Sequence, residues 1–156
     1  MYDVIILGAG AAGMTAAIYT CRKKLKTAIL SIDVGGQTNL TNHIENYPGT
    51  GPMSGPELMQ RFQSEAVGFG AEIIMGKATK VDKTSDGFKV TLANDESYEC
   101  KALILAYGKV PRSLGIENED KFLGRGVSTC VTCDAPLYKN REVAVIGGGN
   151  SAVEGA

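Results

Sequence analysis

Two cysteines separated by two residues carry the clearest chemistry in this chain. Cys130 and Cys133 lie in the segment CVTCD, residues 130–134. Thiol–disulfide exchange needs one thiolate that attacks a disulfide and a neighbouring thiol that resolves the product, and two intervening residues keep that neighbour within reach. The spacing therefore predicts a redox-active dithiol.

Asp134, directly after the second cysteine, is the candidate proton carrier for this dithiol. Thiol and thiolate interchange during disulfide exchange, and a carboxylate beside the second sulfur can act as general acid and base. The alternative is that Asp134 only caps or turns the segment that follows. Both interpretations are open at this point.

A zinc site is the other use of two cysteines at this spacing. Four ligands are needed, but Cys21 and Cys100 form no second close pair and the chain has one histidine. We therefore predict no metal site, and no role for Cys21 or Cys100 beyond that of small residues.

Two glycine-rich loops accompany the dithiol. The first, GAGAAG at residues 8–13, follows the apolar run VIIL, and the second, GGGNSA at residues 147–152, follows the apolar run VAVI. A strand, a glycine turn and a helix in this order are typical of a dinucleotide-binding fingerprint, in which the pyrophosphate lies on the helix amino end. A loop that merely needs positive φ angles is the alternative. The predicted ligand contacts are Gly8, Gly10, Ala11, Ala12, Gly13, Gly147, Gly149, Asn150, Ser151 and Ala152.

The residues around the first loop predict an α/β domain. Residues 2–7 and 27–32 have the apolar composition of buried parallel strands. Between them, one helical face carries Met14, Ala17, Ile18, Cys21 and Leu25. The residue that binds a ribose is expected about 20 residues on, at the end of the second strand. Asp33 and Ser31 are both candidates for it.

The middle of the chain predicts a loop, a helix and a meander. Residues 35–49 form a polar loop that begins with Gly35 and is expected to be functional. A capping box at Ser54 predicts a helix that ends at Gly70. Its apolar face consists of Leu58, Phe62, Ala66 and Phe69. The alternating pattern from residue 72 to 100 predicts an antiparallel meander led by Ile73 and Ile74, followed by a separate buried strand over residues 101–106. Ala106 and Gly108 end that strand, where ligands bind in open α/β sheets.

Two domains follow from these elements. Residues 1–112 are predicted to form a three-layer Rossmann-like domain with an antiparallel β-meander, and residues 113–156 the start of a second Rossmann domain that carries the dithiol. The second domain is expected to contain a strand over residues 142–146 and a helix from Asn150. A parallel strand needs neighbours, so residues 1–156 alone are expected to be an inactive fragment.

Composition narrows the class of protein. Lysine and arginine number 16 against 17 aspartates and glutamates, for a net charge of −1, which disfavours nucleic acid and anionic membrane surfaces as partners. No apolar stretch is long enough to span a membrane, and no basic segment precedes the first apolar run. We therefore expect the protein to be cytoplasmic. Structural disulfides are rare in the cytoplasm.

The order of the motifs closely resembles the N-terminal half of low-molecular-weight thioredoxin reductases, which are FAD-dependent pyridine nucleotide-disulfide oxidoreductases. The motifs are GAGAAG, GGQT, IENYPG, AYG, GRGVSTCVTCD and VAVIGGGNSA, and the resemblance covers the whole chain. The motif GRGVSTCVTCD is the most specific, because other flavoprotein reductases lack a C-x-x-C-D segment just ahead of the second fingerprint. The chain departs from the family at Tyr107, where threonine is common.

The resemblance implies FAD in the first domain, NADPH or NADH in the second, and thioredoxin or a thioredoxin-like protein as the electron acceptor of a homodimer. It implies that Cys133 faces the flavin, that Cys130 exchanges with thioredoxin and that Asp134 is the acid–base residue. The positions that would match flavin contacts are Gly8, Gly10, Gly13, Gly36, Gln37 and Asn46. Gly147, Gly149 and Ala152 would match the nicotinamide phosphate loop.

Two other functions fit parts of the sequence. One is a related flavin dithiol reductase with another partner or donor, such as a peroxiredoxin-reducing or ferredoxin-fed enzyme. The other, which is not an enzyme, is a small zinc-binding or nucleotide-binding module. The electron donor separates the first alternative from thioredoxin reductase, and a metal assay with a flavin spectrum separates the second.

Overall fold

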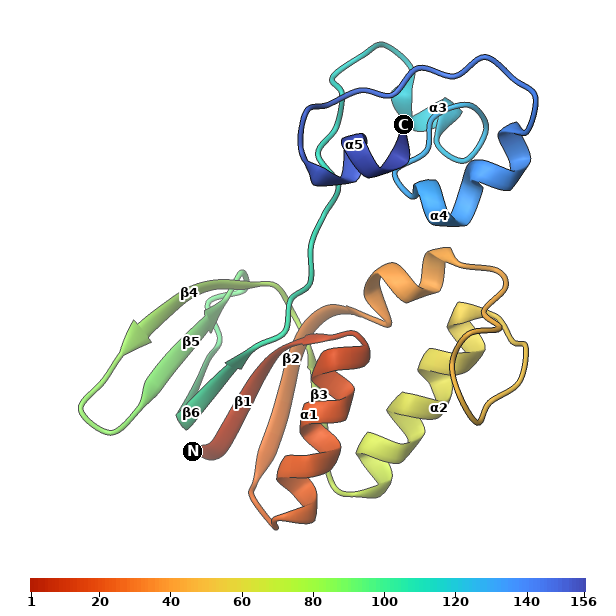
Figure 1. The fold of residues 1–156 in the computed structure, drawn as a ribbon. Coiled ribbons are helices and arrows are strands. Elements are labelled where there is room, and N and C mark those ends of the chain that lie inside the picture. The colour runs from red at the N-terminus through yellow and green to blue at the C-terminus, as the bar shows by residue number, and fades with distance from the viewer. The chain divides into compact units, whose positions relative to one another are not determined.

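The computed structural model describes the backbone of residues 1–156 and all side chains except those of Thr132 and Cys133. The chain divides into two compact units, Met1–Lys109 and Val110–Ala156 (Figure 1). The assignment of two dinucleotide-binding domains with a boundary at residue 112 stays a prediction.

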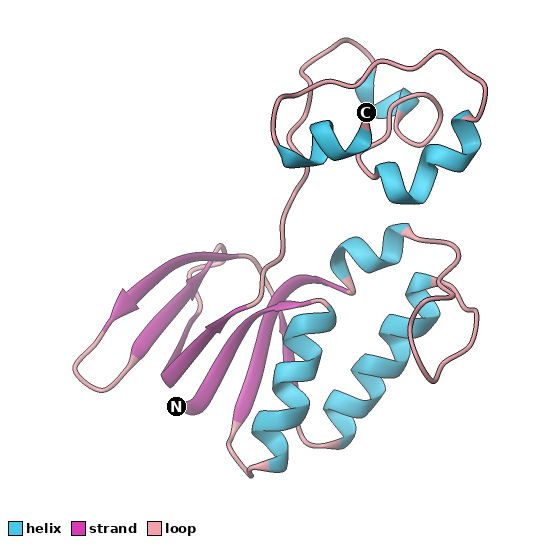
Figure 2. Cartoon of the chain, in the orientation of Figure 1, coloured by secondary structure: helices cyan, strands magenta, loops and turns pink.

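Unit 1 is built on a six-stranded mixed sheet, drawn in magenta in Figure 2, with the strand order β3-β2-β1-β6-β5-β4. The strands are β1 (Tyr2–Ala9), β2 (Thr27–Val34), β3 (Glu72–Met75), β4 (Ala78–Lys83), β5 (Phe88–Leu92) and β6 (Ser97–Leu105). β1 lies parallel to both β2 and β6, so that Ile6 pairs with Ile29 on one side and with Ile104 on the other. Burial on both faces explains why the β1 sequence is an uninterrupted apolar run.

Two helices, α1 (Ala11–Arg22) and α2 (Gly55–Gly68), cover one face of the sheet. Between them and the sheet lies a core that includes Ile6, Met14, Ile29 and Met59. On the opposite face, a second core joins β1 and β2 to the meander. Its members are Ile5, Leu7, Ala28, Leu30, Val90, Leu92 and Cys100. Helices, parallel strands and meander thus form the three layers of the predicted α/β fold.

The strand pairing corrects two predictions. β3 pairs in parallel with β2 at the sheet edge, so Ile73 and Ile74 do not belong to the meander. The end of the predicted meander, before residue 100, and the separate strand predicted over residues 101–106 are one strand, β6. Cys100 pairs with Phe88 in the antiparallel ladder and with Tyr2 in the parallel one. One continuous strand thereby joins the meander to the parallel sheet.

The ends of the two helices correct two further predictions. α1 ends at Arg22, and Lys24 has a φ of +60°, so Leu25 lies beyond the helix and is 39% exposed. Phe69 is the C-terminal cap of α2 rather than part of its buried face, and the Arg22 guanidinium lies over its ring. The capping box at Ser54 is confirmed, because its hydroxyl accepts from the N–H of Glu57 and its own N–H donates to the Glu57 carboxylate.

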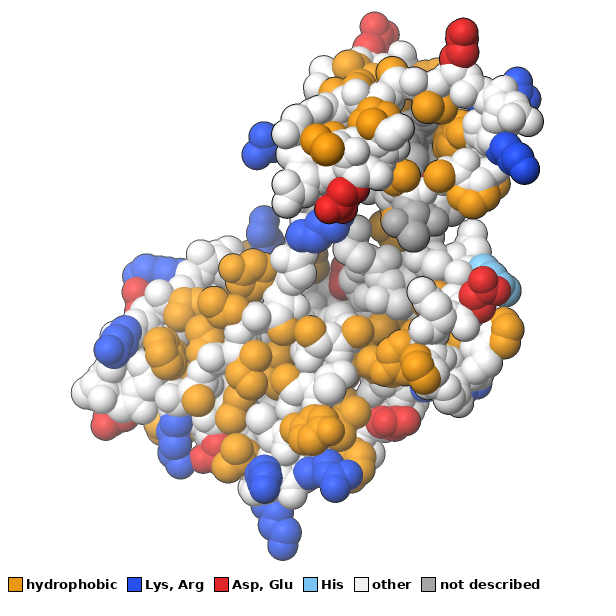
Figure 3. All heavy atoms as spheres, viewed as in Figure 1, with side chains coloured by type: hydrophobic (Ala, Val, Ile, Leu, Met, Phe, Trp, Pro, Cys, Tyr) orange, Lys and Arg blue, Asp and Glu red, His pale blue; other side chains and the backbone are white. Residues whose placement is uncertain are grey.

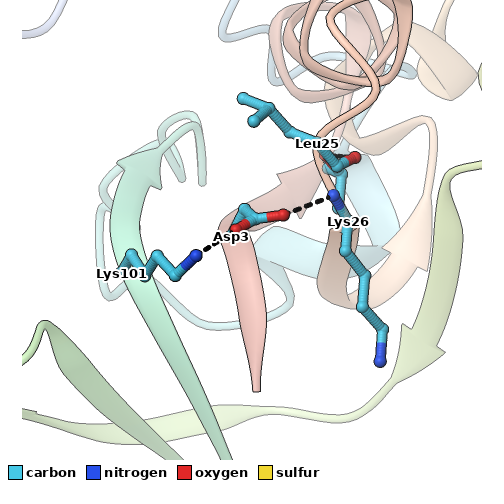
Figure 4. Close-up of polar contacts among 5 residues, drawn as sticks. Asp3, Leu25, Lys26 and Lys101 are labelled. Atoms are coloured by element: carbon cyan, nitrogen blue, oxygen red, sulfur yellow. Dashed lines mark hydrogen bonds and ion pairs between the residues drawn. The ribbon is translucent and has the colours of Figure 1, made fainter.

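Asp3 contacts residues of two neighbouring segments at the end of the sheet where β1 begins (Figure 4). Its carboxylate accepts from the Lys101 ammonium of β6 at 2.7 Å and from the backbone N–H of Lys26, just before β2, at 2.9 Å. Chiefly the Lys101 contact, and then the Lys26 N–H, hold the pKa of Asp3 below its ordinary value of 3.8. The ionised carboxylate is therefore the form that stabilises the fold.

Substituting Asp3→Asn is expected to destabilise the protein at neutral pH and progressively less in acid. A carboxyl whose pKa is lowered by folding stabilises the protein above its unfolded-state pKa, and that contribution is lost as the pH falls through the folded-state pKa. Urea unfolding at pH 7 and at several values below 3.8 measures the difference between wild type and variant. In a Lys101→Met background the pH dependence of this difference should shrink. A difference that is independent of pH would contradict this account.

Unit 2 contains short helices and loops. The helices are α3 (Glu119–Phe122), α4 (Val131–Asp134), η2 (Ala135–Tyr138) and α5 (Asn150–Gly155). The helix predicted from Asn150 is confirmed. The strand predicted over residues 142–146 is wrong, because the described backbone there is not a strand and a parallel strand forms only against a neighbour. Val143 is 63% exposed and Ile146 is 67% exposed. Hydrophobic side chains accordingly lie on the surface of this unit (Figure 3).

Within the described part of the chain, no helix combines the length and hydropathy needed to cross a membrane.

Candidate functional site

Packing within unit 1 requires two glycines of the first loop. Gly8 has a φ of +107°, and a Cβ there would overlap the backbone carbonyl of Ala106. A Cβ on Gly13 would overlap the carbonyl oxygen of Gly8. The tight turn and the close approach of α1 to β1 are therefore possible only with these two glycines.

Gly10 lies in a different environment. It is the N-terminal cap of α1, with an extended backbone at φ −81° and ψ −173°. Apart from Gly10 and its two chain neighbours, no described atom lies within 4 Å of the place where its Cβ would stand, and the next residues, Ala11 and Ala12, are exposed. Neither backbone strain nor internal packing calls for a glycine here. The free space in front of the helix amino end fits the pyrophosphate of a dinucleotide, which a side chain at Gly10 would displace.

The end of β2 is joined to the first loop by two hydrogen bonds. The N–H of Ala9 donates to the Ser31 hydroxyl at 3.1 Å, and the N–H of Gly35 donates to the Ala9 carbonyl at 2.8 Å. Ser31 is only 8% exposed, whereas the Asp33 carboxylate is exposed and accepts from the N–H of Gly36 at 3.2 Å. Of the two ribose-binding candidates, Asp33 is thus the exposed one and Ser31 the buried one.

The remaining candidates of unit 1 lie at two places. Ala106 follows β6 and stands beside the first loop, since its N–H donates to the Leu7 carbonyl at 2.8 Å, and Gly108 has a φ of +68°. Gln37 lies in η1 (Gly36–Leu40), and Asn46 lies in the loop before α2. Both side chains are exposed, and among the described hydrogen bonds none joins them to the first loop. The structure therefore gathers the glycine loop, Ser31, Gly35 and Ala106, but not Gln37 and Asn46.

The second glycine loop, residues 147–152 in unit 2, has the same local backbone arrangement as the first loop, residues 8–13 in unit 1. Gly147 has a φ of +131°, and a Cβ there would lie 3.3 Å from the Cβ of Ala152. Gly149 is the extended N-terminal cap of α5, and apart from its chain neighbours no described atom lies within 4 Å of its Cβ position. Asn150 and Ser151 follow it, and Ser151 is exposed like Asn150. Gly147, Gly149 and Ala152 thus take the places of Gly8, Gly10 and Gly13.

The dithiol segment forms a short helix. Cys130 is the N-terminal cap of α4, and its carbonyl accepts from the N–H of Asp134 at 3.0 Å. Cys130 is disulfide-bonded. The side chain of Cys133 lies outside the described residues, so its pairing with Cys130 stays a prediction.

The other two cysteines have free thiols and are buried. Burial raises the pKa of the Cys100 thiol, which keeps it in the unreactive protonated form. Cys21 lies in the core between α1 and the sheet. Among the described residues, no group of three or more histidine, cysteine or acidic side chains is arranged to hold a metal ion.

Ser128 is a residue of this site that the sequence analysis missed. Its hydroxyl donates to the Asp134 carboxylate at 2.6 Å and accepts from the N–H of Cys130 at 3.1 Å. A serine two residues before a backbone N–H is a recognised turn-forming arrangement. That spacing was a signal for the contact with Cys130, but not for the contact with Asp134.

The mixed sheet with its helices is an α/β fold of the Rossmann-like class. Comparison with known families agrees: residues 2–156 match the family described as pyridine nucleotide-disulphide oxidoreductase, and the chain belongs to this family.

Thioredoxin reductases are the relatives it resembles. That of Treponema pallidum (strain Nichols) is 45% identical over 98% of this chain and 50% of its own length. That of Escherichia coli O157:H7 is 46% identical over 98% and 48%. The crystal structure of thioredoxin reductase from Streptococcus pyogenes MGAS5005 superposes with a TM-score of 0.85 at 43% identity, covering 100% of this chain and 51% of that one. The chain thus spans about half the length of the curated relatives it matches.

Proposed function

We propose that the gene product carrying this sequence is a flavin-dependent thioredoxin-disulfide reductase. It passes electrons from NADPH, or NADH, through FAD to Cys130 and Cys133, and on to thioredoxin or a thioredoxin-like protein. The observation that carries the proposal is the disulfide-bonded Cys130 in a C-x-x-C-D segment just ahead of a second glycine loop. Relatives named thioredoxin reductase at 45–46% identity support it.

Unit 1 is the proposed FAD site. The amino end of α1 at Gly10, Ala11 and Ala12 would take the pyrophosphate, and the Asp33 carboxylate would accept from a ribose hydroxyl. The other proposed contacts are Gly8, Gly13, Ser31, Gly35, Gly36, Gln37, Asn46, Ala106 and Gly108. When bound, FAD supplies a carrier that takes two electrons from a nicotinamide and gives them to a disulfide.

Unit 2 is the proposed nicotinamide site. Its phosphate loop would be formed by the open Gly149 and the first turn of α5, with Gly147 and Ala152 allowing the turn. Asn150 and Ser151 would add backbone N–H groups and polar side chains toward the phosphate. The loop does not by itself distinguish NADPH from NADH.

Cys130, Cys133 and Asp134 are proposed to have different roles in electron and proton transfer. Cys133 would exchange electrons with the flavin, and Cys130 would attack the disulfide of thioredoxin. Asp134 would move the proton that thiol and thiolate must exchange. We further propose that the protein works as a homodimer in the cytoplasm, where a reducing environment keeps such dithiols in turnover.

The purified gene product is expected to oxidise NADPH only when thioredoxin is present. The assay compares NADPH, NADH and reduced ferredoxin as donors, and thioredoxin and a peroxiredoxin as acceptors. Turnover with ferredoxin alone, or with the peroxiredoxin but not thioredoxin, would replace the proposal with a related flavin dithiol reductase. Zinc without flavin would indicate a binding module instead.

A further inference from the structure

Ser128 links the first cysteine to the acid–base carboxylate. Its oxygen lies 2.6 Å from Oδ2 of Asp134, 3.1 Å from the N–H of Cys130 and 3.3 Å from the Cys130 carbonyl oxygen. A hydroxyl has one proton to donate, and the shortest contact, to a carboxylate, is the strongest. The proton of Ser128 is therefore directed at Asp134, while its lone pair receives the Cys130 N–H.

Among the described hydrogen bonds, the one from Ser128 is the only one to the Asp134 side chain. Ser128 is exposed and Asp134 is only half-buried, at the last position of the four-residue helix α4. A short helix with an exposed face does not fix the rotamers of its carboxylate by packing. The hydrogen bond from Ser128 is thus the contact that orients the carboxylate relative to the backbone of Cys130.

From this geometry we infer that Ser128 is a positioning residue for proton transfer at the dithiol. The inference rests on the proposed function, because it assumes that Asp134 is the acid–base group. The structure assigns Ser128 the task of keeping the carboxylate directed toward the Cys130 end of α4, rather than free to turn into solvent. Ser128 keeps its own proton throughout and contacts no substrate.

The proton balance shows why orientation matters. Cys130 gives its proton to Asp134 and its thiolate attacks the substrate disulfide, so that an S–S bond to Cys130 forms and the departing substrate sulfur takes up that proton. The Cys133 thiol then gives its proton to Asp134 as it attacks the Cys130 sulfur, the bond between Cys130 and the substrate breaks, and the second substrate sulfur leaves and takes up this second proton. Two thiols of the enzyme are oxidised to a disulfide, and the substrate disulfide is reduced to two thiols. Asp134 carries protons between these sulfurs, so its carboxylate must face the sulfur that gains or loses a proton in each step.

Substituting Ser128→Ala in the full gene product is expected to lower kcat for thioredoxin roughly 10-fold and leave KM for thioredoxin unchanged, since acid–base groups contribute about 10²-fold or more and here only their positioning is lost. Ser128→Thr should restore most of the rate. Ser128→Val has the shape of threonine without the hydroxyl, and should behave like Ser128→Ala. Thr129→Ala, the neighbouring exposed hydroxyl residue, is the matched control and should match wild type.

The double-mutant cycle with Asp134→Asn decides whether Ser128 acts through Asp134. If it does, Ser128→Ala has no further effect in the Asp134→Asn background. A purely structural role would instead multiply the two losses. Wild-type rates in Ser128→Ala and Ser128→Val, or multiplied losses in the cycle, would overturn the inference.

A second measurement separates this inference from the proposed function. The rate at which dithiothreitol reduces the Cys130 disulfide does not depend on NADPH, FAD or thioredoxin. It should fall in Ser128→Ala and Ser128→Val and recover in Ser128→Thr. If wild type fails to reduce thioredoxin, the proposed function is wrong, while the dithiothreitol rates still support or overturn the role of Ser128.

Discussion

Replacing Gly10 with valine is expected to abolish FAD binding by the gene product that carries this sequence, while unit 1 still folds. The backbone of Gly10 is extended, a conformation that valine adopts readily, and in the described structure its Cβ would meet nothing within 4 Å. The same side chain would occupy the space that the pyrophosphate needs at the amino end of α1. The measurements are the flavin absorbance of the purified variant and its thermal unfolding by circular dichroism.

Gly13→Ala is the matched control for this prediction. A Cβ at Gly13 overlaps the Gly8 carbonyl, so this smaller substitution is expected to destabilise unit 1 by about 3 kcal/mol or more, the upper end of overpacking effects. It should therefore lose both flavin and cooperative unfolding, whereas Gly10→Val loses flavin alone. A Gly10→Val protein with a full complement of FAD would show that the first loop is not the flavin site.

The contrast between these two glycines also shows what the sequence alone predicts. The motif GAGAAG, its flanking strand and its helix were predicted because each depends on residues close in sequence. The capping box at Ser54 was predicted for the same reason, since Ser54 and Glu57 are three residues apart. The motif does not say which glycine serves packing and which serves the ligand, because that depends on the atoms that each Cβ would meet in the folded chain.

Pairing between distant segments was harder to predict. The residues of β3 have the same apolar character in a meander as in a parallel sheet, so Ile73 and Ile74 gave no indication of their partner, β2. β6 was divided in two because its character changes at Cys100, where its pairing changes from antiparallel to parallel. The strand predicted over residues 142–146 has a suitable sequence but pairs with no strand of the described structure, and propensity without a partner does not make a strand.

Polar contacts between residues that are not neighbours in sequence could not be predicted from the sequence either. Asp134 was singled out because it is next to Cys133, but the serine that holds its carboxylate lies six residues earlier. The choice between Ser31 and Asp33 stayed open for the same reason. It depends on the hydrogen bond from Ala9, which lies 22 residues before Ser31. Such contacts form only after the backbone has placed both residues.

Serine substitutions at the two cysteines are expected to have the largest effects on activity. Either Cys130→Ser or Cys133→Ser should reduce thioredoxin turnover by about 10³-fold or more, because a serine hydroxyl cannot take part in disulfide exchange and the two sulfurs act as a unit. Cys21→Ala is the control, since its thiol is free and buried in the core of unit 1. That variant should keep the activity of wild type. The measurement is NADPH oxidation in the presence of thioredoxin.

The same two variants test the proposed division of roles between the sulfurs. In Cys130→Ser the remaining sulfur is that of Cys133, which is proposed to lie against the flavin, so a thiolate there should give a long-wavelength charge-transfer absorbance. In Cys133→Ser the remaining sulfur is that of Cys130, proposed to face thioredoxin, and this absorbance should be absent. The reverse pattern would exchange the two roles, with Cys130 as the flavin-facing sulfur. Because both variants lose turnover, only the spectrum distinguishes the sulfur that receives electrons from the sulfur that passes them on.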